Sequence, residues 1–554
     1  MVLPFGPTAF SFSSSDHLRV VQRPCVRGER PIMETSDHTI ALREVYALHA
    51  EGRLVEAETR YRDILKTTPD HPYLLFALGT VCGQLNRHDE AKAFLERAAA
   101  IDRNNADVYG NLASTYRALD DLPASLEAFQ QANRISPGRF SFLCGVGATL
   151  LLLGRKQEAR RTLTETVARH PNEAAAWGNL GSALVMCSEP EVAVACLDQA
   201  LALNPNYADA IYNRGAANYD LARFASAEAD ARLAISATAP GSTLHFGARM
   251  NLGIARIVQG HEDGWNDYEA RLQTGKMLGL PSSAPQLRAD TNLVGARVLI
   301  KAEQGLGDLI QFCRYAAFFR QKGAYVILEA HRPLVEILRQ ANLADEIVQI
   351  GEPLPKHDWH VPLMSTPYLY GTDVAAATNF PYLSVPQDTV AAWRERFGGQ
   401  RAKIGLVCSG NASHKSDALR STPLETFAPL LECDADFYLV QNEIRETDQA
   451  FLRRSNIQDL SPQLIDFTDT AGALSALDLL VSVDTSVAHL AGALNLPVWM
   501  MLALGPDYRW LALGETTRWY PSIRLFRQKK LREFDGLIPD VRQALDAFLS
   551  ARAA

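Results

Sequence analysis

Two patterns of apolar residues divide the chain. From about residue 38 to about residue 275, apolar positions recur with the spacing of amphipathic helices. From residue 296 onward, short runs rich in Val, Ile and Leu alternate with helical segments. Apolar strands separated by helices are typical of parallel sheets covered on both faces. We therefore expect an all-helical N-terminal part followed by an α/β part.

The helical part is repetitive, with a period of 34 residues. Prolines share one phase of this period, and small residues share another. The prolines are Pro69, Pro137, Pro171 and Pro205, and the small residues are Ala57, Ala91, Ser125, Ala159, Ala193 and Ala227. The small residue is needed where two helices of one unit cross closely, and the proline ends the second helix. This is the pattern of the tetratricopeptide repeat (TPR), and it predicts a solenoid of six units at 36–240.

Four asparagines hold the same place in the first helix of their units. They are Asn111, Asn179, Asn213 and Asn251. An amide side chain offers a donor and an acceptor to an extended peptide, so this column predicts a groove that binds a protein acceptor. The alternative is that asparagine is simply common at this place in TPR units.

The solenoid is expected to end in an irregular seventh unit and a linker, at 241–285. Trp265 and Tyr268 are expected to pack this end onto the next domain. Two Rossmann-like lobes should follow, at 286–395 and 396–554. Strands are predicted at 297–302, 325–329, 346–350, 403–408, 437–441, 479–483 and 498–502, and a last helix at 540–550.

The first candidate site follows the first predicted strand. Gly305 and Gly307 allow a sharp turn and the close approach of a ligand, and Asp308 comes at the start of the next helix. Ligands of open α/β sheets bind at this edge. Asp308 can act there as a general base, or it can cap the helix. The third glycine of a dinucleotide-binding motif is missing, and so is the Gly-Lys-Ser/Thr of a P-loop.

The second lobe offers two more candidate segments. Residues 409–420 follow a strand and contain Lys415 and Arg420, which suit an anionic ligand, although a solvated polar loop would look the same. At 484–489 a strand ends and a helix begins. Asp484, Thr485 and Ser486 can cap this helix, its free amides can hold a phosphate, and His489 is one turn further in. A lone histidine at such a place is more often part of the core.

Composition and charge exclude some classes of protein. The net charge of -8 argues against a nucleic-acid partner. No apolar run is long enough to span a membrane. The eight cysteines form no CxxC pair or regular framework, so we expect reduced core residues, a cytoplasmic protein and no metal site.

Residues 1–35 show no periodicity and no signal-peptide pattern. We expect disorder there, with Met33 as an alternative start of translation.

Taken together, the motifs resemble those of GT-B glycosyltransferases, and residues 290–530 resemble the heptosyltransferase-like family. That family has a Gly-Asp turn in one lobe and an Asp-Thr helix start followed by His in the other; here these are Gly307-Asp308 and Asp484-Thr485 through His489. The resemblance implies that Asp308 is the catalytic base. It also implies that Gly305, Gly307, Lys415, Arg420 and residues 484–489 bind the donor. The layout resembles bacterial TPR glycosyltransferases, including those that modify flagellin, and the O-GlcNAc transferases.

The expected function is therefore metal-independent transfer of a sugar from a nucleotide sugar to Ser or Thr of a protein such as flagellin. The nucleotide sugar is a co-substrate, and no cofactor is expected. Two alternatives stay open. One is an enzyme that acts on a glycan or a lipid-linked acceptor, and the other is a TPR scaffold without catalytic activity.

Overall fold

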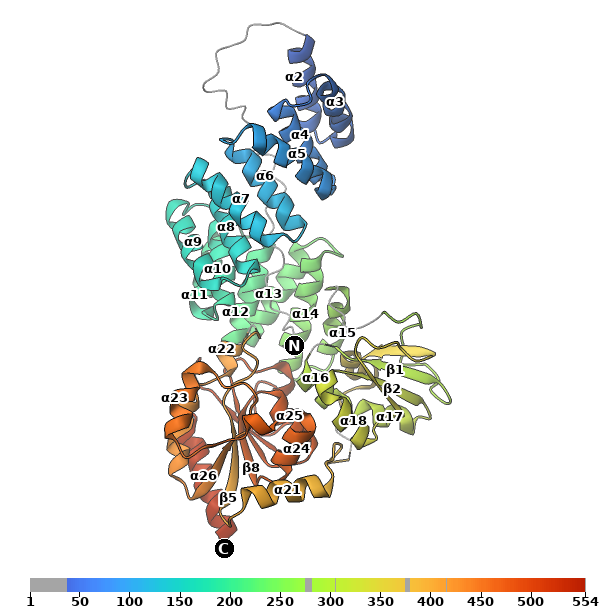
Figure 1. Ribbon diagram of the computed structural model, residues 1–554, viewed down its shortest axis with the longest axis vertical. Helices are drawn as coiled ribbons and strands as arrows, with labels where there is room; N and C mark the ends of the chain where they lie inside the picture. Colours follow the sequence, from blue (N-terminus) through green and yellow to red (C-terminus); the bar gives the residue numbers. More distant parts are fainter. Residues whose placement is uncertain (1–36, 275–280, 304, 374–378, 415, 554) are drawn as a thin grey trace. The chain divides into compact units, whose positions relative to one another are not determined.

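A computed structural model describes residues 37–274, 281–303, 305–373, 379–414 and 416–553. The predicted disordered segment 1–35 and Lys415 lie outside the described residues. The chain forms two compact parts, one that ends at Arg214 and one that begins at Gly215. Figure 1 shows paired helices in the first part, and further helices and two sheets in the second. The expected fold class, a TPR solenoid followed by an α/β region, is confirmed.

Six helical pairs match the six predicted repeat units. Each helix has 13 or 14 residues. The pairs are α2 (Asp37–Ala50) with α3 (Leu54–Thr67), α4 (Pro72–Gln84) with α5 (His88–Ile101), α6 (Ala106–Ala118) with α7 (Leu122–Ile135), α8 (Phe140–Leu152) with α9 (Lys156–Arg169), α10 (Ala174–Met186) with α11 (Pro190–Leu203), and α12 (Ala208–Asp220) with α13 (Phe224–Ala237).

The small residues of the repeat lie where the paired helices cross. Ala57, Ala91, Ser125, Ala159 and Ala193 are fully buried, and Ala227 is nearly so. A glycine on the first helix of a pair can allow the same close approach: an added Cβ at Gly147 would lie 2.6 Å from Leu163 Cδ2. The period in the sequence therefore reflects the geometry of helix packing, since a larger side chain at these places would separate the two helices.

A seventh, irregular unit belongs to the second compact part. It comprises α14 (Thr243–Val258), the short α15 (Gly264–Tyr268) and the 3₁₀ helix η1 (Glu269–Thr274). The Trp265 ring lies 6.3 Å from the ring of Phe312 and 5.7 Å from that of Tyr508, centroid to centroid. These contacts confirm that the end of the solenoid packs onto the α/β region through its aromatic residues.

The first sheet has four parallel strands in the order β3-β2-β1-β4. They are β1 (Arg297–Lys301), β2 (Tyr325–Ala330), β3 (Glu346–Gln349) and β4 (Trp359–Pro362). Their connecting helices include α16 (Leu306–Phe312), α17 (Tyr315–Gln321), α18 (Val335–Ala341) and α19 (Thr366–Tyr370). Strand β4 was not predicted, because its four residues include Trp, His and Pro and lack an apolar run.

The second sheet has six parallel strands in the order β10-β9-β8-β5-β6-β7. They are β5 (Ala402–Val407), β6 (Ala435–Leu439), β7 (Gln458–Asp459), β8 (Leu479–Val483), β9 (Val498–Leu502) and β10 (Ile523–Arg527). Strands β7 and β10 were not predicted: β7 has two polar residues, and two arginines interrupt β10. The strand order reverses between β5 and β8: β6 and β7 are added on one side of β5, and β8 to β10 on the other. The loops after β5 and β8 therefore meet at the edge where open α/β sheets bind ligands.

Helices cover both faces of the second sheet (Figure 1). Leu479, Val481 and Val483 of β8 join one hydrophobic cluster, which also contains residues of η4 (Leu424–Glu432) and α26 (Ile538–Ala553). Leu480 joins the other cluster, with residues of α24 (Phe467–Ser475) and α25 (Ser486–Ala493). Both faces of β8 are therefore apolar, and this explains why its position could be predicted from the sequence.

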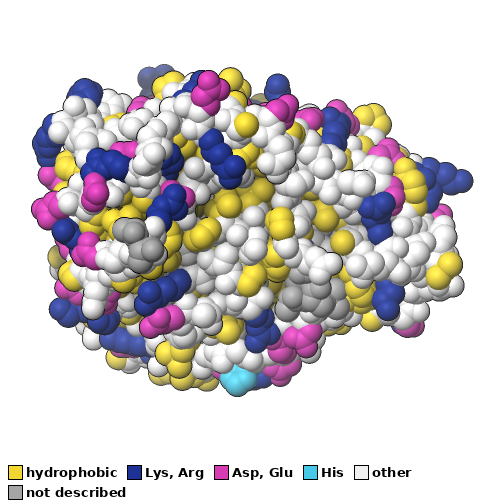
Figure 2. Space-filling view, turned by 90° about the horizontal axis from the view of Figure 1, so that it is seen from below, with side chains coloured by type: hydrophobic (Ala, Val, Ile, Leu, Met, Phe, Trp, Pro, Cys, Tyr) yellow, Lys and Arg dark blue, Asp and Glu magenta, His cyan; other side chains and the backbone are white. Residues whose placement is uncertain are grey.

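The described cysteines and one face of the surface can be compared with the composition. None of the described cysteines forms a disulfide, and most of them are buried. On the face shown in Figure 2, basic and acidic side chains are interspersed and form no extended patch of one sign. Among the described residues, no helix has the length and apolar character that crossing a membrane would require.

Candidate functional site

The turn after β1 places Asp308 in the first turn of α16. Gly305 precedes this helix with a φ of 105°, a conformation that favours glycine. The side chain of Asp308 is buried, and Nη2 of Arg509 donates a hydrogen bond to its Oδ1 over 2.5 Å. No described residue of α16 donates a backbone hydrogen bond to this carboxylate, so Asp308 pairs with an arginine and does not cap its own helix.

Electrostatics at Asp308 combine two opposing effects. Burial raises the pKa of Asp308 above its ordinary value, and the positive charge of Arg509 acts in the opposite direction. A carboxyl group with a raised pKa is a stronger base than an exposed carboxylate, and therefore better suited to take a proton near neutral pH.

The end of β8 forms the second side of the site. Thr485 is the N-cap residue of α25, and Asp484 precedes it; Ser486 begins the helix. His489, one turn later, is 2% exposed, and its Nδ1 lies 2.8 Å from the hydroxyl of Tyr520. Its Nε2 has no hydrogen-bond partner among the described residues, and the nearest carboxylate oxygen of Asp484 is 3.8 Å away.

His489 is held as a neutral imidazole. Burial lowers the pKa of His489 well below 6.5, and the nearby cations Arg509, Arg314 and Arg420 lower it further. Its ring also stacks on Trp510, with the centroids 5.1 Å apart. A neutral histidine with one unpaired ring nitrogen can give or accept one hydrogen bond from a ligand.

The two sides of the site are in direct contact, because α16 packs on α25. A Cβ added at Gly307 would lie 2.9 Å from Cδ2 of His489. Real Cβ atoms essentially never come so close to another heavy atom, so a side chain at 307 would push the two helices apart. The structure therefore brings the pair Gly307-Asp308 together with His489, which is far from them in the sequence.

Arg509 connects the two sides, and no motif in the sequence pointed to it. Its Nε lies 3.2 Å from Asp507 Oδ1, while its Nη2 binds Asp308. Burial raises the pKa of Asp507 to about 7, against the effect of Arg509. Both residues belong to the segment Gly505-Pro-Asp-Tyr-Arg-Trp510, which follows β9. A Gly-Pro turn with charged residues after a buried strand is the signal that could have found them.

A narrow cavity opens beside these residues, at the edge where β5, β8 and β9 end. Its volume is about 40 Å³, room for only a few water molecules. A ligand as large as a nucleotide would fit here only in a more open state of this region. The residues that line it are Tyr219, Asp220, His414, Ser416, Leu419, Arg420, Asp484, Leu502, Ala503, Gly505, Pro506 and Asp507.

Arg420 reaches this cavity from the loop after β5. It ends the short helix α22 (Asp417–Arg420), and its Nε lies 3.8 Å from Asp417 Oδ1. Gly410 makes room for the guanidinium, because a Cβ added there would lie 2.7 Å from Arg420 Nη2. The structure thus places Arg420 beside Asp484, whereas the predicted donor contact of Lys415 lies outside the described residues.

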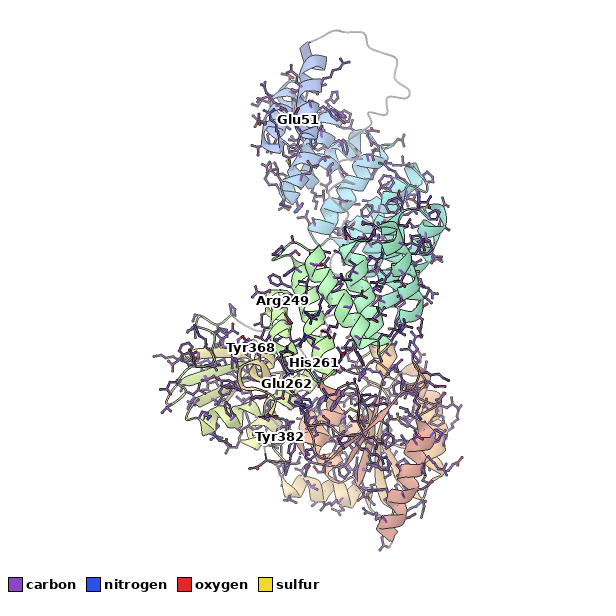
Figure 3. All side chains as sticks on the ribbon, turned by 180° about the vertical axis from the view of Figure 1, so that it is seen from behind. Glu51, Arg249, His261, Glu262, Tyr368 and Tyr382 are labelled. Carbon is purple, nitrogen blue, oxygen red and sulfur yellow. The ribbon has the colours of Figure 1, made fainter. Side chains whose placement is uncertain are left out.

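Beyond this edge, Glu262 and Tyr382 anchor the segments around the two sheets (Figure 3). Glu262, between α14 and α15, accepts a hydrogen bond from the Thr372 hydroxyl over 3.0 Å and also binds Arg518. The Tyr382 hydroxyl accepts a hydrogen bond from Arg314 over 2.8 Å. These contacts connect the seventh unit, the first lobe and the segment before β10, so they hold α16 and α25 in place.

The four predicted acceptor-binding asparagines differ in their surroundings. Asn179, Asn213 and Asn251 are buried, and Asn111 is partly exposed. The Asn111 amide donates to the Thr80 hydroxyl over 2.8 Å, and that of Asn213 donates to the Asp209 carbonyl over 2.8 Å. The carbonyl oxygen of the Asn251 side chain is buried without a partner among the described residues. Their role in binding an acceptor stays a prediction.

Comparisons with known proteins agree with the repeats. Family models of the tetratricopeptide repeat match residues 48–115, 106–139, 149–186 and 188–243. Among solved structures, a tetratricopeptide repeat protein from Parabacteroides merdae is 16% identical; the match covers 43% of this chain and 93% of that one, with a TM-score of 0.38. The predicted TPR units are thus confirmed over most of the solenoid.

Two curated relatives extend the comparison. Protein FlbA of Caulobacter vibrioides is 24% identical over 495 residues, which cover 82% of this chain and 81% of FlbA. Protein O-mannosyl-transferase TMTC3 of Homo sapiens is 26% identical over 167 residues, which cover 29% of this chain but only 18% of TMTC3. The chain therefore carries tetratricopeptide repeats and is distantly similar to FlbA along most of its length and to an O-mannosyltransferase over a shorter part.

Proposed function

We propose that this protein is a GT-B glycosyltransferase that moves a sugar from a nucleotide sugar to a Ser or Thr hydroxyl of a protein bound by its TPR units. The observation that carries this proposal is the contact between α16 and α25. It puts a buried carboxylate, Asp308, next to the helix start that follows β8, at the edge where open α/β sheets generally bind ligands. The similarity to TMTC3, which is named an O-mannosyltransferase, supports the same class of reaction.

In the proposed reaction the acceptor oxygen attacks the anomeric carbon of the sugar. The bond between that carbon and the phosphate oxygen breaks, and Asp308 takes the proton of the hydroxyl. Arg509, which binds the Asp308 carboxylate, would orient it toward the acceptor. Because Asp308 is buried in the described state, the two lobes must separate to admit substrates and close again around them.

The leaving nucleoside diphosphate needs groups that stabilise negative charge. Arg420 lines the cavity, and the backbone amides at the start of α25 face the same edge of the sheet. The neutral His489 can add one hydrogen bond through Nε2. These groups suffice for the charge without a metal ion, so the proposed reaction uses no cofactor.

Replacement of Asp308 by Asn tests the base. The full-length protein would be incubated with UDP-, GDP- and CMP-sugars and with flagellin or other surface proteins, and transfer would be followed by intact mass. We expect Asp308→Asn to lower the rate about 100-fold or more, because a general base contributes roughly 10²–10⁴-fold. Asp290→Asn is the control, since Asp290 is exposed and pairs only with exposed Arg288 among the described residues. A full rate in Asp308→Asn would rule out this base.

One observation favours the alternative of a scaffold without activity. The Asp308 carboxylate is already occupied by Arg509, and the adjoining cavity holds only a few water molecules. The same incubation separates the two functions. If no donor binds and none is consumed, the α/β region serves as a structural support for the protein-binding repeats.

A further inference from the structure

The first helix of the sixth repeat unit, α12, ends at the wall of the candidate donor pocket. Helix α12 stops at Asp220, and both Tyr219 and Asp220 line the cavity at the edge of the second sheet. The Tyr219 hydroxyl donates a hydrogen bond to the Pro506 carbonyl over 2.9 Å. A Cβ added at Gly505 would lie 2.5 Å from the Tyr219 carbonyl oxygen, so the two backbones are in contact there.

The carboxylate of Asp220 has no obvious structural purpose. No hydrogen bond or ion pair joins it to any residue in the described part of the chain. Burial raises the pKa of Asp220 to about 7, because the charged form is poorly solvated there. Among the described residues the half-buried Asp220 carboxylate lacks a partner, and a carboxylate at the wall of a cavity can accept hydrogen bonds from a ligand.

The charges around the cavity restrict what that partner can be. Asp220, like Asp484 and Asp507 on the same cavity, would repel a phosphate group, whereas Arg420 would attract one. A carboxylate accepts hydrogen bonds well from hydroxyl groups. A ligand that satisfies both residues therefore carries phosphate at one end and neighbouring hydroxyl groups at the other, as a nucleoside diphosphate sugar does.

We propose that Asp220 is a positioning residue of the donor pocket, which accepts hydrogen bonds from hydroxyl groups of the donor's ribose or sugar while Arg420 binds its phosphates. This proposal rests on the proposed glycosyl transfer and adds to it a residue from the repeat region. The donor pocket is then complete only when the sixth repeat unit is in place, because α12 contributes one of its walls.

The test compares ligands that do and do not carry hydroxyl groups. The full-length protein and Asp220→Asn would be titrated by calorimetry with UDP, GDP, UDP-glucose, GDP-mannose and inorganic pyrophosphate. We expect the variant to lose about tenfold in affinity for the nucleotide or the nucleotide sugar, the effect of one hydrogen bond to a charged group. Pyrophosphate has no hydroxyl groups of this kind and should bind the variant as well as the wild type, or more tightly.

The source of the hydroxyl groups can be separated in the same titrations. If they belong to the ribose, UDP loses affinity in the variant while 2′-deoxy-UDP binds both proteins equally. If they belong to the sugar, UDP is unaffected and UDP-glucose or GDP-mannose alone loses affinity. Asp290→Asn again serves as the control, because it removes an exposed carboxylate outside the cavity.

Two results would overturn the proposal, and they differ from each other. An equal loss for pyrophosphate and nucleotides in Asp220→Asn, or no loss for either, would show that Asp220 does not bind hydroxyl groups. Failure of the wild type to bind any probe would overturn the proposed function itself. Thermal unfolding checks that the variant is folded: its Tm should not fall, because Asp220→Asn removes a charge that burial disfavours. Asp220→Ser is a second variant with the same expected losses.

Discussion

At the scale of single residues, the site depends on a position without a side chain, Gly307, and on an uncharged histidine, His489. Gly307 allows α16 to approach α25, and His489 is buried as a neutral ring between Trp510 and Tyr520. A cation at His489 would face Arg509 and would be poorly solvated, so the neutral form is the one that folding favours. Two substitutions test these points.

Gly307→Ala should separate the two helices. The added methyl group would meet His489 at 2.9 Å, and overpacking of this kind costs about 1–3 kcal/mol in a packed core. We expect a lower Tm of the second compact part and a loss of transfer activity. Gly83→Ala is the matched control: it lies in helix α4, the added Cβ would have 3.8 Å of space, and alanine favours the helix. Unchanged stability of Gly307→Ala would contradict the proposed close contact.

His489 should make stability depend on pH in a predictable direction. Burial lowers the pKa of His489, so below about pH 6.5 this histidine binds a proton in the unfolded chain but not in the folded protein. The free energy of unfolding then falls as the pH is lowered, by up to about 1.4 kcal/mol per pH unit from this residue. Asp220 and Asp507 have the opposite effect, because their pKa values are raised to about 7 in the folded protein. They increase the free energy of unfolding as the pH is lowered from about 7 to about 4.

The comparison of His489→Gln with the wild type isolates this contribution. Chemical denaturation between pH 5 and 8 should give a flatter pH profile for the variant, whatever its absolute stability. His71→Gln, at an exposed position, should keep the profile of the wild type. Parallel profiles for His489→Gln and the wild type would show that His489 titrates normally in the folded protein.

At the scale of elements, a buried ion pair joins the seventh unit to the first sheet. Arg271 of η1 binds Glu303, which follows β1, through two hydrogen bonds of 2.8 and 2.9 Å. The side chains are 8% and 12% exposed. Glu303 also accepts a hydrogen bond from the backbone N–H of Met364, after β4. The ion pair therefore occupies the point where the loops after β1 and β4 meet.

Removal of one partner of this ion pair should lower the free energy of unfolding. Arg271→Leu leaves Glu303 buried without its cation, which typically costs about 3–5 kcal/mol. Arg288→Leu is the control, because its partner Asp290 and Arg288 itself are 78% exposed and such pairs contribute little. Denaturant titration followed by tryptophan fluorescence would measure both. A loss below about 1 kcal/mol in Arg271→Leu would mean that water reaches Glu303 freely.

At the scale of the whole molecule, the chain divides between Arg214 and Gly215, inside α12. The sequence placed the end of the solenoid at residue 240, where the regular period stops. The compact parts follow contacts and not the repeat period: α13 packs on α14, and α14 packs on η6 (Tyr508–Trp510) of the α/β region. The two parts should therefore differ in stability, since each has its own core.

Thermal unfolding should show two transitions that respond to different substitutions. Leu163→Ala removes a fully buried side chain of α9 and should cost about 2–5 kcal/mol in the first part only. Arg271→Leu should shift only the transition of the second part. Scanning calorimetry of both variants, with the wild type as reference, assigns each transition. A single transition that both substitutions lower would show that the whole chain unfolds as one unit.

The sequence by itself determined the helices and strands whose positions follow from a local or periodic pattern of residues. The 34-residue period located the repeat units, because helices can cross closely only at a small residue such as Ala57 or Ala159. Strands such as β8 and β9 were predicted with their exact limits, since a strand buried on both faces is a continuous apolar run. Short or charged strands such as β10 carry no such signal, and only their neighbours in the sheet reveal them.

The candidate site was predictable in part, for the same reason. Asp308 and His489 could be selected because each follows a strand and a turn that the sequence shows. Arg509 and Asp220 could not, because their importance comes from contact with segments hundreds of residues away in the chain. Only the tertiary structure decided that Arg509 meets Asp308 and that α12 ends in the pocket, since burial and charge pairing depend on packing and not on local sequence.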